Sequence, residues 1–359
     1  MQLGRGGIGL AVVLWAMCPP ADAASVPVRV PAGNPVFRYL GNWREADENH
    51  VTIQPGSQVR FRLIGAAHLD VQPGATDELS VLLRKNGEPV WKGILATNGL
   101  EADGGSTGGV FSLIYLAARH PQIDPLDSEA APATLRFRGL WLHGDARLEE
   151  IPDAAPDLRV DFVGDSITVG ASIAGRTNDW HLNFDASRTF SFQLAEALSA
   201  DYRIWAFGGA RGGDILAYLP RQLAETNGDV PGIVFINVGA NNRSLTEDAY
   251  GQLMRQLVDA SIAACPQAKV VLLNFFRMTP NRLPSLRKLS QAYPPGTVCC
   301  FDARPYLVGY SDGGVHPDPE SHAQLARALA DWTRRELAPG VAPDARASAV
   351  CDQTAAANE

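Results

Sequence analysis

Three residues carry side chains suited to nucleophilic attack on a carbonyl group: Ser166 and, much later in the chain, Asp312 and His316. A serine hydroxyl is a poor nucleophile until a neighbouring base takes its proton, and His316 suits that role by type and by position. Asp312, four residues earlier, can accept a hydrogen bond from the other ring nitrogen, which fixes the tautomer and stabilises the imidazolium. A backbone carbonyl can orient the histidine equally well. The sequence therefore predicts a Ser-His(-Asp) site and leaves the third member open.

Attack on an ester carbonyl creates an oxyanion, and an oxyanion needs hydrogen-bond donors that are already in place. The candidates are the backbone N–H groups of Ser166 and Gly209 and the side-chain amide of Asn241. Glycine at position 209 lets the backbone approach a substrate closely. The surrounding stretch AFGGARGGD holds four glycines, so Gly212 competes with Gly209 for this role.

Ser166 also has a simpler interpretation. It lies in RVDFVGDSITVG, residues 159–170, where a Gly-Asp-Ser follows a run of strand-like residues. The same pattern is typical of a helix N-terminus with a polar cap, so the tripeptide alone favours neither reading. What favours a nucleophile is the ordered combination, because each chemically useful residue follows a different predicted strand.

Those strands and helices alternate from residue 157 to residue 337. Five apolar runs have the length of strands: VDFVGDS, RIWAFGG, GIVFINVGA, KVVLLNFF and VCCFDAR. Three intervening or closing stretches have helical spacing: FSFQLAEALSA, EDAYGQLMRQLVDASIAAC and ESHAQLARALADWTRREL. This alternation predicts a flavodoxin-like three-layer α/β/α domain with a mostly parallel sheet, whose site lies beyond the carboxyl ends of the strands.

Residues 26–151 have a different composition. Short alternating or apolar runs are separated by Gly, Pro and Asn, and no good amphipathic helix appears. LLRKNGEPVWKG places Asn-Gly between two apolar runs, which is a strong hairpin signal. This half is therefore predicted to be an antiparallel β-sandwich.

The chain ends carry separate signals. Residues 1–23 combine one Arg, an apolar run and an Ala-Asp-Ala, which predicts a secretory signal peptide cleaved after Ala23 and a secreted or periplasmic protein. Residues 338–359 are small and polar and are predicted to form a loose tail. A hydrophobic content of 46% and a formal charge of −8 favour a globular protein without a nucleic-acid partner. No later apolar run is long enough to span a membrane.

Four cysteines remain after the predicted cleavage: Cys265, Cys299, Cys300 and Cys351. An exported chain permits disulfides, and one bridge between Cys265 and the vicinal pair is plausible. Their spacing does not resemble a closed zinc site. No metal and no organic cofactor is predicted.

The ordered blocks resemble the SGNH, or GDSL-type, hydrolase superfamily over Asp157 to about Leu337. The resemblance implies that Ser166 is the nucleophile, that Gly209 and Asn241 are oxyanion donors, and that His316, followed by Pro317, is the base. The β-sandwich that precedes it, joined through FRGLWLHGDARLEEIPDAAPDLRVDFVGDSITVG, looks like the junction in carbohydrate esterase family 2. There a jelly-roll domain precedes the hydrolase domain, and these enzymes are similar in removing acetyl groups from sugars.

The sequence departs from that superfamily at three points. Asn242 replaces the usual Asp of the third block, Asp312 stands four residues before His316, and the second block carries competing glycines. Gly313 and Gly314 could form a bulge that restores the contact between Asp312 and His316.

Further residues have predicted roles outside the acyl-transfer step. Asp165, Trp180 and Asn242 are candidates for contacts with the substrate. Asn242 is also a candidate for local support, and a surface loop without a ligand is the preferred interpretation of Trp180 and His181. His322 falls inside the last helix, where a packing or surface role is predicted.

The leading hypothesis is an exported carbohydrate acetyl esterase. The alternatives are a lipase or thioesterase of the same fold acting on longer acyl chains, and a carbohydrate-binding protein whose esterase site has decayed.

Overall fold

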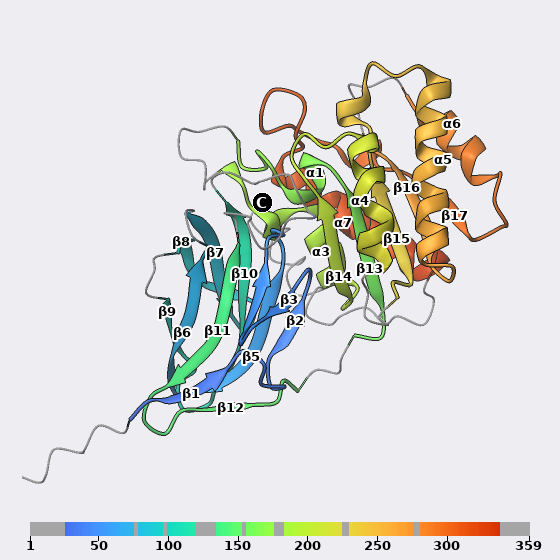
Figure 1. Cartoon of the computed structure of the whole chain (residues 1–359). Coiled ribbons are helices and arrows are strands. Elements are labelled where there is room, and N and C mark those ends of the chain that lie inside the picture. Colours follow the sequence, from blue (N-terminus) through green and yellow to red (C-terminus); the bar gives the residue numbers. More distant parts are fainter. Residues whose placement is uncertain are drawn as a thin grey trace, which may run out of the picture.

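The computed structural model describes residues 26–74, 78–95, 99–118, 134–152, 156–175, 183–224, 230–275 and 281–337. The signal-peptide prediction, the predicted C-terminal tail and Cys351 lie outside these residues. Two units follow one another along the chain, a β-sandwich and an α/β unit (Figure 1). The proposed boundary at residues 151–157 falls between their nearest strands.

The sandwich consists of two antiparallel sheets, as predicted. Their orders are β3-β4-β11-β6-β9, with β1 beside β11, and β12-β5-β10-β7-β8, with β2 beside β5. Residues 85–88 form the predicted hairpin turn, because Asn86 and Gly87 both take the positive φ angles that a tight turn between β7 and β8 needs. The strands are β1 (Val28–Pro31), β2 (Arg38–Leu40), β3 (Arg44–Ala46), β4 (Asn49–Thr52), β5 (Gln58–Ile64), β6 (Ala66–Pro73), β7 (Leu79–Lys85), β8 (Glu88–Ile94), β9 (Leu100–Asp103), β10 (Gly109–Ala118), β11 (Leu135–Leu142) and β12 (Arg147–Glu149).

The α/β unit has a five-stranded sheet in the order β14-β13-β15-β16-β17, and every pair in it is parallel. This is the flavodoxin-like order, in which the chain moves outward in both directions from the first strand. All five predicted strands are confirmed: β13 (Arg159–Gly164), β14 (Asp201–Ala206), β15 (Ile233–Asn237), β16 (Lys269–Asn274) and β17 (Val298–Asp302).

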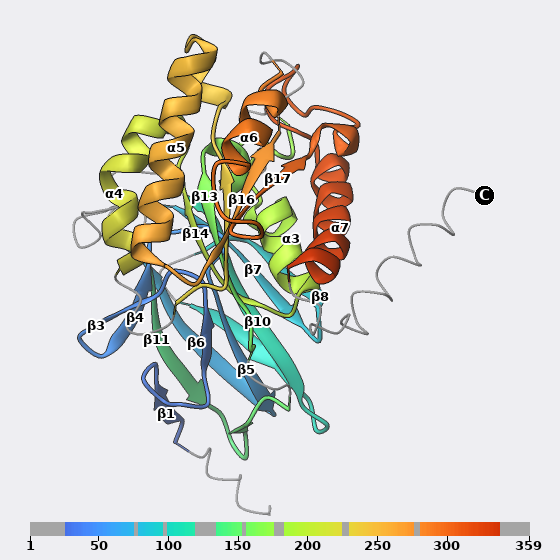
Figure 2. The same ribbon diagram turned by 90° about the vertical axis from the view of Figure 1, so that its right-hand side faces the viewer.

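Helices cover both faces of this sheet (Figure 2). On one face α3 (Phe190–Ala197) and α7 (Pro319–Glu336) share a core with Phe162 and Phe235. On the other face α4 (Gly212–Ala224), α5 (Glu247–Ala264) and α6 (Leu283–Ser290) share a core with Val163 and Val234. Successive strand residues point to opposite faces, so both layers are anchored by the same apolar strands.

The sandwich packs against the edge strand β14, which is otherwise unpaired on its outer side. The Ile204 N–H donates to Asn42 Oδ1 at 2.8 Å, and Gln54 Nε2 donates to the Ala206 carbonyl at 3.2 Å. Four apolar residues from the sandwich join the core on the α3 side: Leu40, Leu82, Ile114 and Leu116. The sandwich thereby covers an exposed sheet edge, the position at which a strand would otherwise offer its backbone to other chains.

Helices α4 and α6 were not predicted. The first turn of α4 contains Gly212 and Gly213 and its interior contains Pro220, all of which disfavour a helix by propensity. Burial of Ile215, Leu219 and Leu223 against the sheet outweighs that preference.

The plausible disulfide is not formed, because Cys265, Cys299 and Cys300 are free thiols. The two neighbours on β17 point to opposite faces of the sheet: Cys299 packs with the α7 layer, and Cys300 packs in the layer that also buries Cys265. Burial raises the pKa of Cys300 to about 12, so this thiol is protonated at neutral pH.

Among the described residues, no helix combines the length and the apolar character needed to cross a bilayer.

Candidate active site

Ser166 is the first residue of a short helix, α1 (Ser166–Val169), directly after β13. The helix packs so closely on the strand that only glycine fits at position 164. A Cβ there would lie 2.1 Å from Thr168 Oγ1. Thr168 is tied down on both sides: Asn237 Nδ2 donates to its hydroxyl at 2.9 Å, and Ser191 Oγ donates to its carbonyl at 2.9 Å. The turn that carries the serine is therefore rigid.

The helix cap is Asp165, not Ser166. Asp165 has extended backbone angles, and its Oδ1 accepts the Ile167 N–H at 3.0 Å. This leaves the Ser166 hydroxyl free of a capping role. Its backbone N–H is at the first helical position, where intrahelical bonding supplies no acceptor.

His316 connects Ser166 to Asp312. Its Nε2 lies 3.0 Å from Ser166 Oγ, and its Nδ1 lies 2.6 Å from Asp312 Oδ2. The other oxygen, Asp312 Oδ1, accepts the backbone N–H groups of Val315 and His316 at 3.1 and 2.9 Å. Ser166, His316 and Asp312 thus form one hydrogen-bonded chain across 150 residues of sequence.

Two glycines make the unusual spacing possible. Gly313 and Gly314 have φ angles of +85° and +136°, which L side chains rarely adopt, and the loop turns back on itself there. The Ser311 N–H then pairs with the His316 carbonyl at 2.9 Å, closing the loop. The four-residue separation is accommodated by this bulge, and a carboxylate rather than a backbone carbonyl faces the His316 Nδ1.

The Asp312 carboxylate is held in its ionised form. Burial alone would raise its pKa, but the hydrogen bonds from the His316 ring and from the two backbone N–H groups outweigh burial and hold the pKa well below its usual range. Because the ionised Asp312 accepts a hydrogen bond from Nδ1, the imidazole tautomer with its proton on Nδ1 is favoured over the other one, and the lone pair on Nε2 faces the serine.

The structure distinguishes the two competing glycines after β14. Gly212 begins α4: its N–H donates to Asn242 Oδ1 at 3.0 Å, and a Cβ there would lie 2.4 Å from the Leu253 side chain. Gly209 has a φ angle of +78° and open space where a Cβ would be. Gly212 therefore takes part in the packing of α4, whereas Gly209 has open space beside it and can face a ligand.

Asn241 and Asn242 lie in a short 3-10 helix, η2 (Ala240–Asn242), after β15. Asn241 Nδ2 donates one hydrogen to the Ala210 carbonyl at 3.0 Å, which fixes the orientation of the amide and leaves its second hydrogen available. Asn242 is buried and accepts the Gly212 N–H. An amide oxygen accepts that bond as a carboxylate would, so the exchange of Asp for Asn keeps the support that links two strand tips.

Asp165, which is predicted to contact the substrate, is only 1% exposed, so its side chain is buried and not open to a ligand. Burial raises the pKa of Asp165 to about 7, against the lowering effect of backbone N–H groups that include those of Ile167 and Ala240. Its Oδ2 has no hydrogen-bond partner among the described residues. Asp165 is thus an internal link between the serine turn and the turn that carries Asn241.

His322 is buried in α7, in agreement with its predicted packing role. Its Nδ1 accepts the Phe190 N–H at 3.0 Å, and burial lowers its pKa to about 3, which keeps the ring neutral. It joins α7 to the first turn of α3. Trp180 and His181 lie outside the described residues.

A flavodoxin-like sheet with this serine, histidine and carboxylate at its strand tips defines a carboxylic ester hydrolase. The model of the GDSL-like Lipase/Acylhydrolase family matches residues 162–345, and the chain belongs to this family. No curated protein matches the chain by sequence.

Three solved structures share the whole two-unit arrangement. An acetyl xylan esterase from the rumen bacterium Butyrivibrio proteoclasticus has 18% identity and a TM-score of 0.67, covering 87% of this chain and 99% of its own. A family two carbohydrate esterase from Clostridium thermocellum in complex with cellohexaose has 18% identity and a TM-score of 0.66, covering 84% and 99%. A family two carbohydrate esterase from Cellvibrio japonicus has 16% identity and a TM-score of 0.64, covering 87% and 98%. At these sequence identities, the similarity to the three structures establishes the fold alone.

Proposed function

We propose that the protein is an exported serine esterase that removes acetyl groups from a carbohydrate. The observation that carries the proposal is the continuous hydrogen-bonded chain from Ser166 through His316 to Asp312. Family membership supports ester hydrolysis, and the similarity of both units to an acetyl xylan esterase and to a carbohydrate esterase in complex with cellohexaose supports a sugar substrate. The sequence signal at residues 1–23 supports export.

In the proposed first half-reaction, Ser166 Oγ attacks the acetyl carbonyl carbon while its proton passes to His316 Nε2. The negative charge on the carbonyl oxygen is stabilised by the N–H groups of Ser166 and Gly209 and by the free amide hydrogen of Asn241. Asp312 stabilises the imidazolium. Collapse of the tetrahedral intermediate breaks the ester C–O bond, and the sugar oxygen leaves with the proton from His316.

In the second half-reaction, His316 takes a proton from water, and the resulting hydroxide attacks the acetyl group on Ser166. The intermediate collapses to acetic acid as the proton passes from His316 to Ser166 Oγ, and the acid then ionises to acetate in water. No further group is needed to balance either step.

The geometry argues against a decayed esterase site. The two departures that motivate that alternative are Asn242 and the displaced Asp312. Asn242 retains an acceptor for the Gly212 N–H, and Asp312 reaches His316 at 2.6 Å.

Acetate release from acetylated xylan, mannan, peptidoglycan and an exopolysaccharide tests this proposal, with Ser166→Ala beside the wild type. The variant is expected to lose at least about 10⁴-fold in kcat, since the nucleophile is removed, while the Tm stays nearly unchanged. Ser290→Ala, which removes a half-buried hydroxyl that donates to the Arg287 carbonyl within α6, is the matched control. Retained turnover in Ser166→Ala would refute the mechanism, and a preference for octanoyl over acetyl esters would favour a lipase or thioesterase instead.

A further inference from the structure

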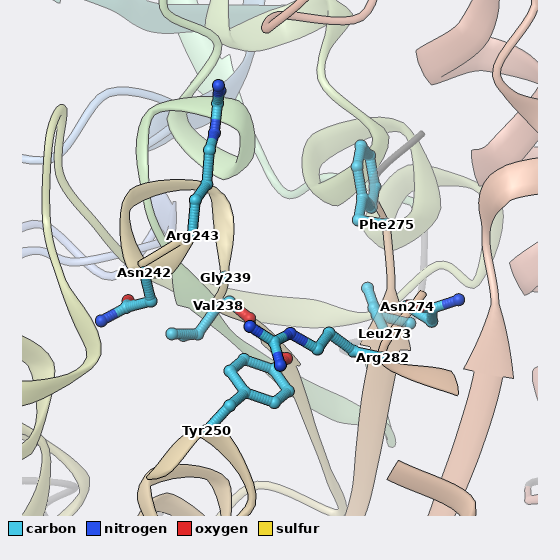
Figure 3. A pocket seen from close by; sticks show the side chains of 9 residues that line it. All are labelled: Val238, Gly239, Asn242, Arg243, Tyr250, Leu273, Asn274, Phe275 and Arg282. Carbon is cyan, nitrogen blue, oxygen red and sulfur yellow. The ribbon is translucent and has the colours of Figure 1, made fainter. Parts of the chain in front are cut away.

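A pocket opens at the carboxyl ends of β15 and β16 (Figure 3). Gly239 and Asn242, from the turn that carries Asn241, form one side of it, and Leu273, Asn274 and Phe275 form another. Neighbouring strands are about 4.8 Å apart, so the pocket lies roughly 5 to 10 Å along the sheet edge from the end of β13 and Ser166. A sugar unit next to the one being deacetylated falls within that distance.

The pocket is positively charged in a protein whose overall charge is negative. Arg243 and Arg282 both line it, and none of its described lining residues is acidic, although Glu247 pairs with Arg282 from behind the wall. The whole chain carries a formal charge of −8, so the positive charge of Arg243 departs from the average composition. Such local positive charge favours an anionic ligand.

Arg282 is a fixed part of the pocket wall. The residue is 6% exposed. Its guanidinium donates to Glu247 at 2.5 Å and to the Leu245 carbonyl at 2.7 Å, and it lies 4.8 Å from the centre of the Tyr250 ring. Its donors are largely used, and Glu247 offsets much of its charge. Arg282 therefore forms part of the pocket wall and contributes little to the binding of a ligand.

Arg243 has the opposite character. Its Nε donates to the Ala240 carbonyl at 3.0 Å, which anchors the base of the guanidinium to the residue before Asn241. The group is exposed, and it forms no ion pair with the carboxylates of the described residues. Figure 3 shows its side chain rising from the η2 turn on the side of the pocket opposite Phe275. Two guanidinium nitrogens remain available in the planar arrangement that suits a carboxylate.

We propose that Arg243, on the exposed rim of this pocket, binds the carboxylate of an acidic sugar that neighbours the acetylated unit. The inference rests on the proposed function and narrows its substrate class to acetylated acidic glycans. A compact guanidinium beside the turn of Asn241 positions such a chain with its ester toward Ser166.

A matched substrate pair tests this proposal: an acetylated oligogalacturonate and the same oligosaccharide with its carboxylates methyl-esterified, with acetate release followed in both. The wild type is expected to have a higher kcat/KM on the acid form. Arg243→Gln should lower the ratio of acid to methyl ester by about tenfold or more, because a charge-assisted contact is lost. Arg243→Lys should retain part of the preference, and Arg335→Gln, at the far end of α7, should leave the ratio unchanged.

Four results would overturn the proposal. A wild-type ratio near one would show that the carboxylate is not recognised. An equal loss on both substrates in Arg243→Gln would show that Arg243 only supports the η2 turn. Turnover of p-nitrophenyl acetate without acetate release from any glycan would refute the carbohydrate function itself, whereas release from neutral glycans without the Arg243 effect would refute only the acidic subsite.

Discussion

The parallel sheet and the β-sandwich place their buried polar side chains in different ways. In the sandwich, Asn42 and Gln54 lie at the contact with β14 and satisfy backbone groups of that strand. In the parallel sheet, polar residues gather at the strand tips, where Ser166 meets His316 and Asn241 meets the Ala210 carbonyl. Parallel strands all end at one edge, so residues distant in sequence converge there, whereas antiparallel strands alternate their ends. The comparison indicates that the α/β unit performs the reaction and that the sandwich supports its outer strand.

Asp312→Asn tests whether the α/β unit performs the reaction. Apart from Ser166→Ala, it is expected to have the largest effect on activity. The amide keeps an acceptor for the backbone N–H groups of Val315 and His316, but it no longer stabilises the imidazolium. We expect kcat on p-nitrophenyl acetate to fall by about 10³- to 10⁴-fold with little change in KM. Activity within tenfold of the wild type would mean that something other than the carboxylate orients His316.

Asn241→Ala is expected to have the next largest effect. It removes one donor to the oxyanion, which is present only in the transition state. We expect kcat to fall by about 10²- to 10³-fold, while KM for the acetyl ester changes little. If KM rises and kcat is unchanged, Asn241 binds the ground state and is not an oxyanion donor.

Asp165→Asn tests the packing at the strand tips through the pH dependence of the free energy of unfolding. The pKa of Asp165 is raised in the folded protein to about 7, above its usual value of 3.8, so the folded state holds a proton that the unfolded state has lost. The free energy of unfolding of the wild type should therefore fall as the pH rises from about 4 to 7.

In Asp165→Asn the contribution of residue 165 to this pH dependence is absent. The free energy of unfolding of the wild type relative to the variant should decrease by about 2 to 4 kcal/mol across this range. Urea denaturation at pH 4.5, 6 and 8 measures the difference. Parallel stability curves for the two proteins would contradict the buried, protonated state of Asp165.

The smallest effect is expected in the sandwich. Asn42→Ala leaves the Ile204 N–H of the edge strand without its acceptor and should lower the free energy of unfolding by about 1 to 3 kcal/mol. Because Asn42 lies away from the strand tips, kcat/KM should stay within twofold of the wild type. Gln291→Ala, an exposed amide after α6, serves as the control. A large loss of activity in Asn42→Ala would show that the sandwich takes part in the reaction.

The sequence predicts the fold where local patterns are strong. Uninterrupted apolar runs predict all five parallel strands, and Asn86-Gly87 predicts the hairpin turn. Helix α4 could not be predicted, since Gly212, Gly213 and Pro220 disfavour a helix that only packing on the sheet stabilises.

The sequence also predicts the candidate site where local motifs are strong. Ser166, His316 and Asn241 follow from ordered motifs at strand ends. The contact between Asp312 and His316 depends on the backbone angles of Gly313 and Gly314, and the choice between Gly209 and Gly212 depends on Leu253, which is distant in sequence. Arg243 carries no sequence signal beyond its place after the third strand.

Covalent labelling of the nucleophile tests the central claim most directly. Incubation with diethyl p-nitrophenyl phosphate should release one equivalent of p-nitrophenolate, add one diethylphosphoryl group, and abolish esterase activity in parallel. Peptide mass spectrometry should place that group on Ser166, and Ser166→Ala should take up none. A label at another residue, or full activity after stoichiometric labelling of Ser166, would contradict a mechanism through this serine.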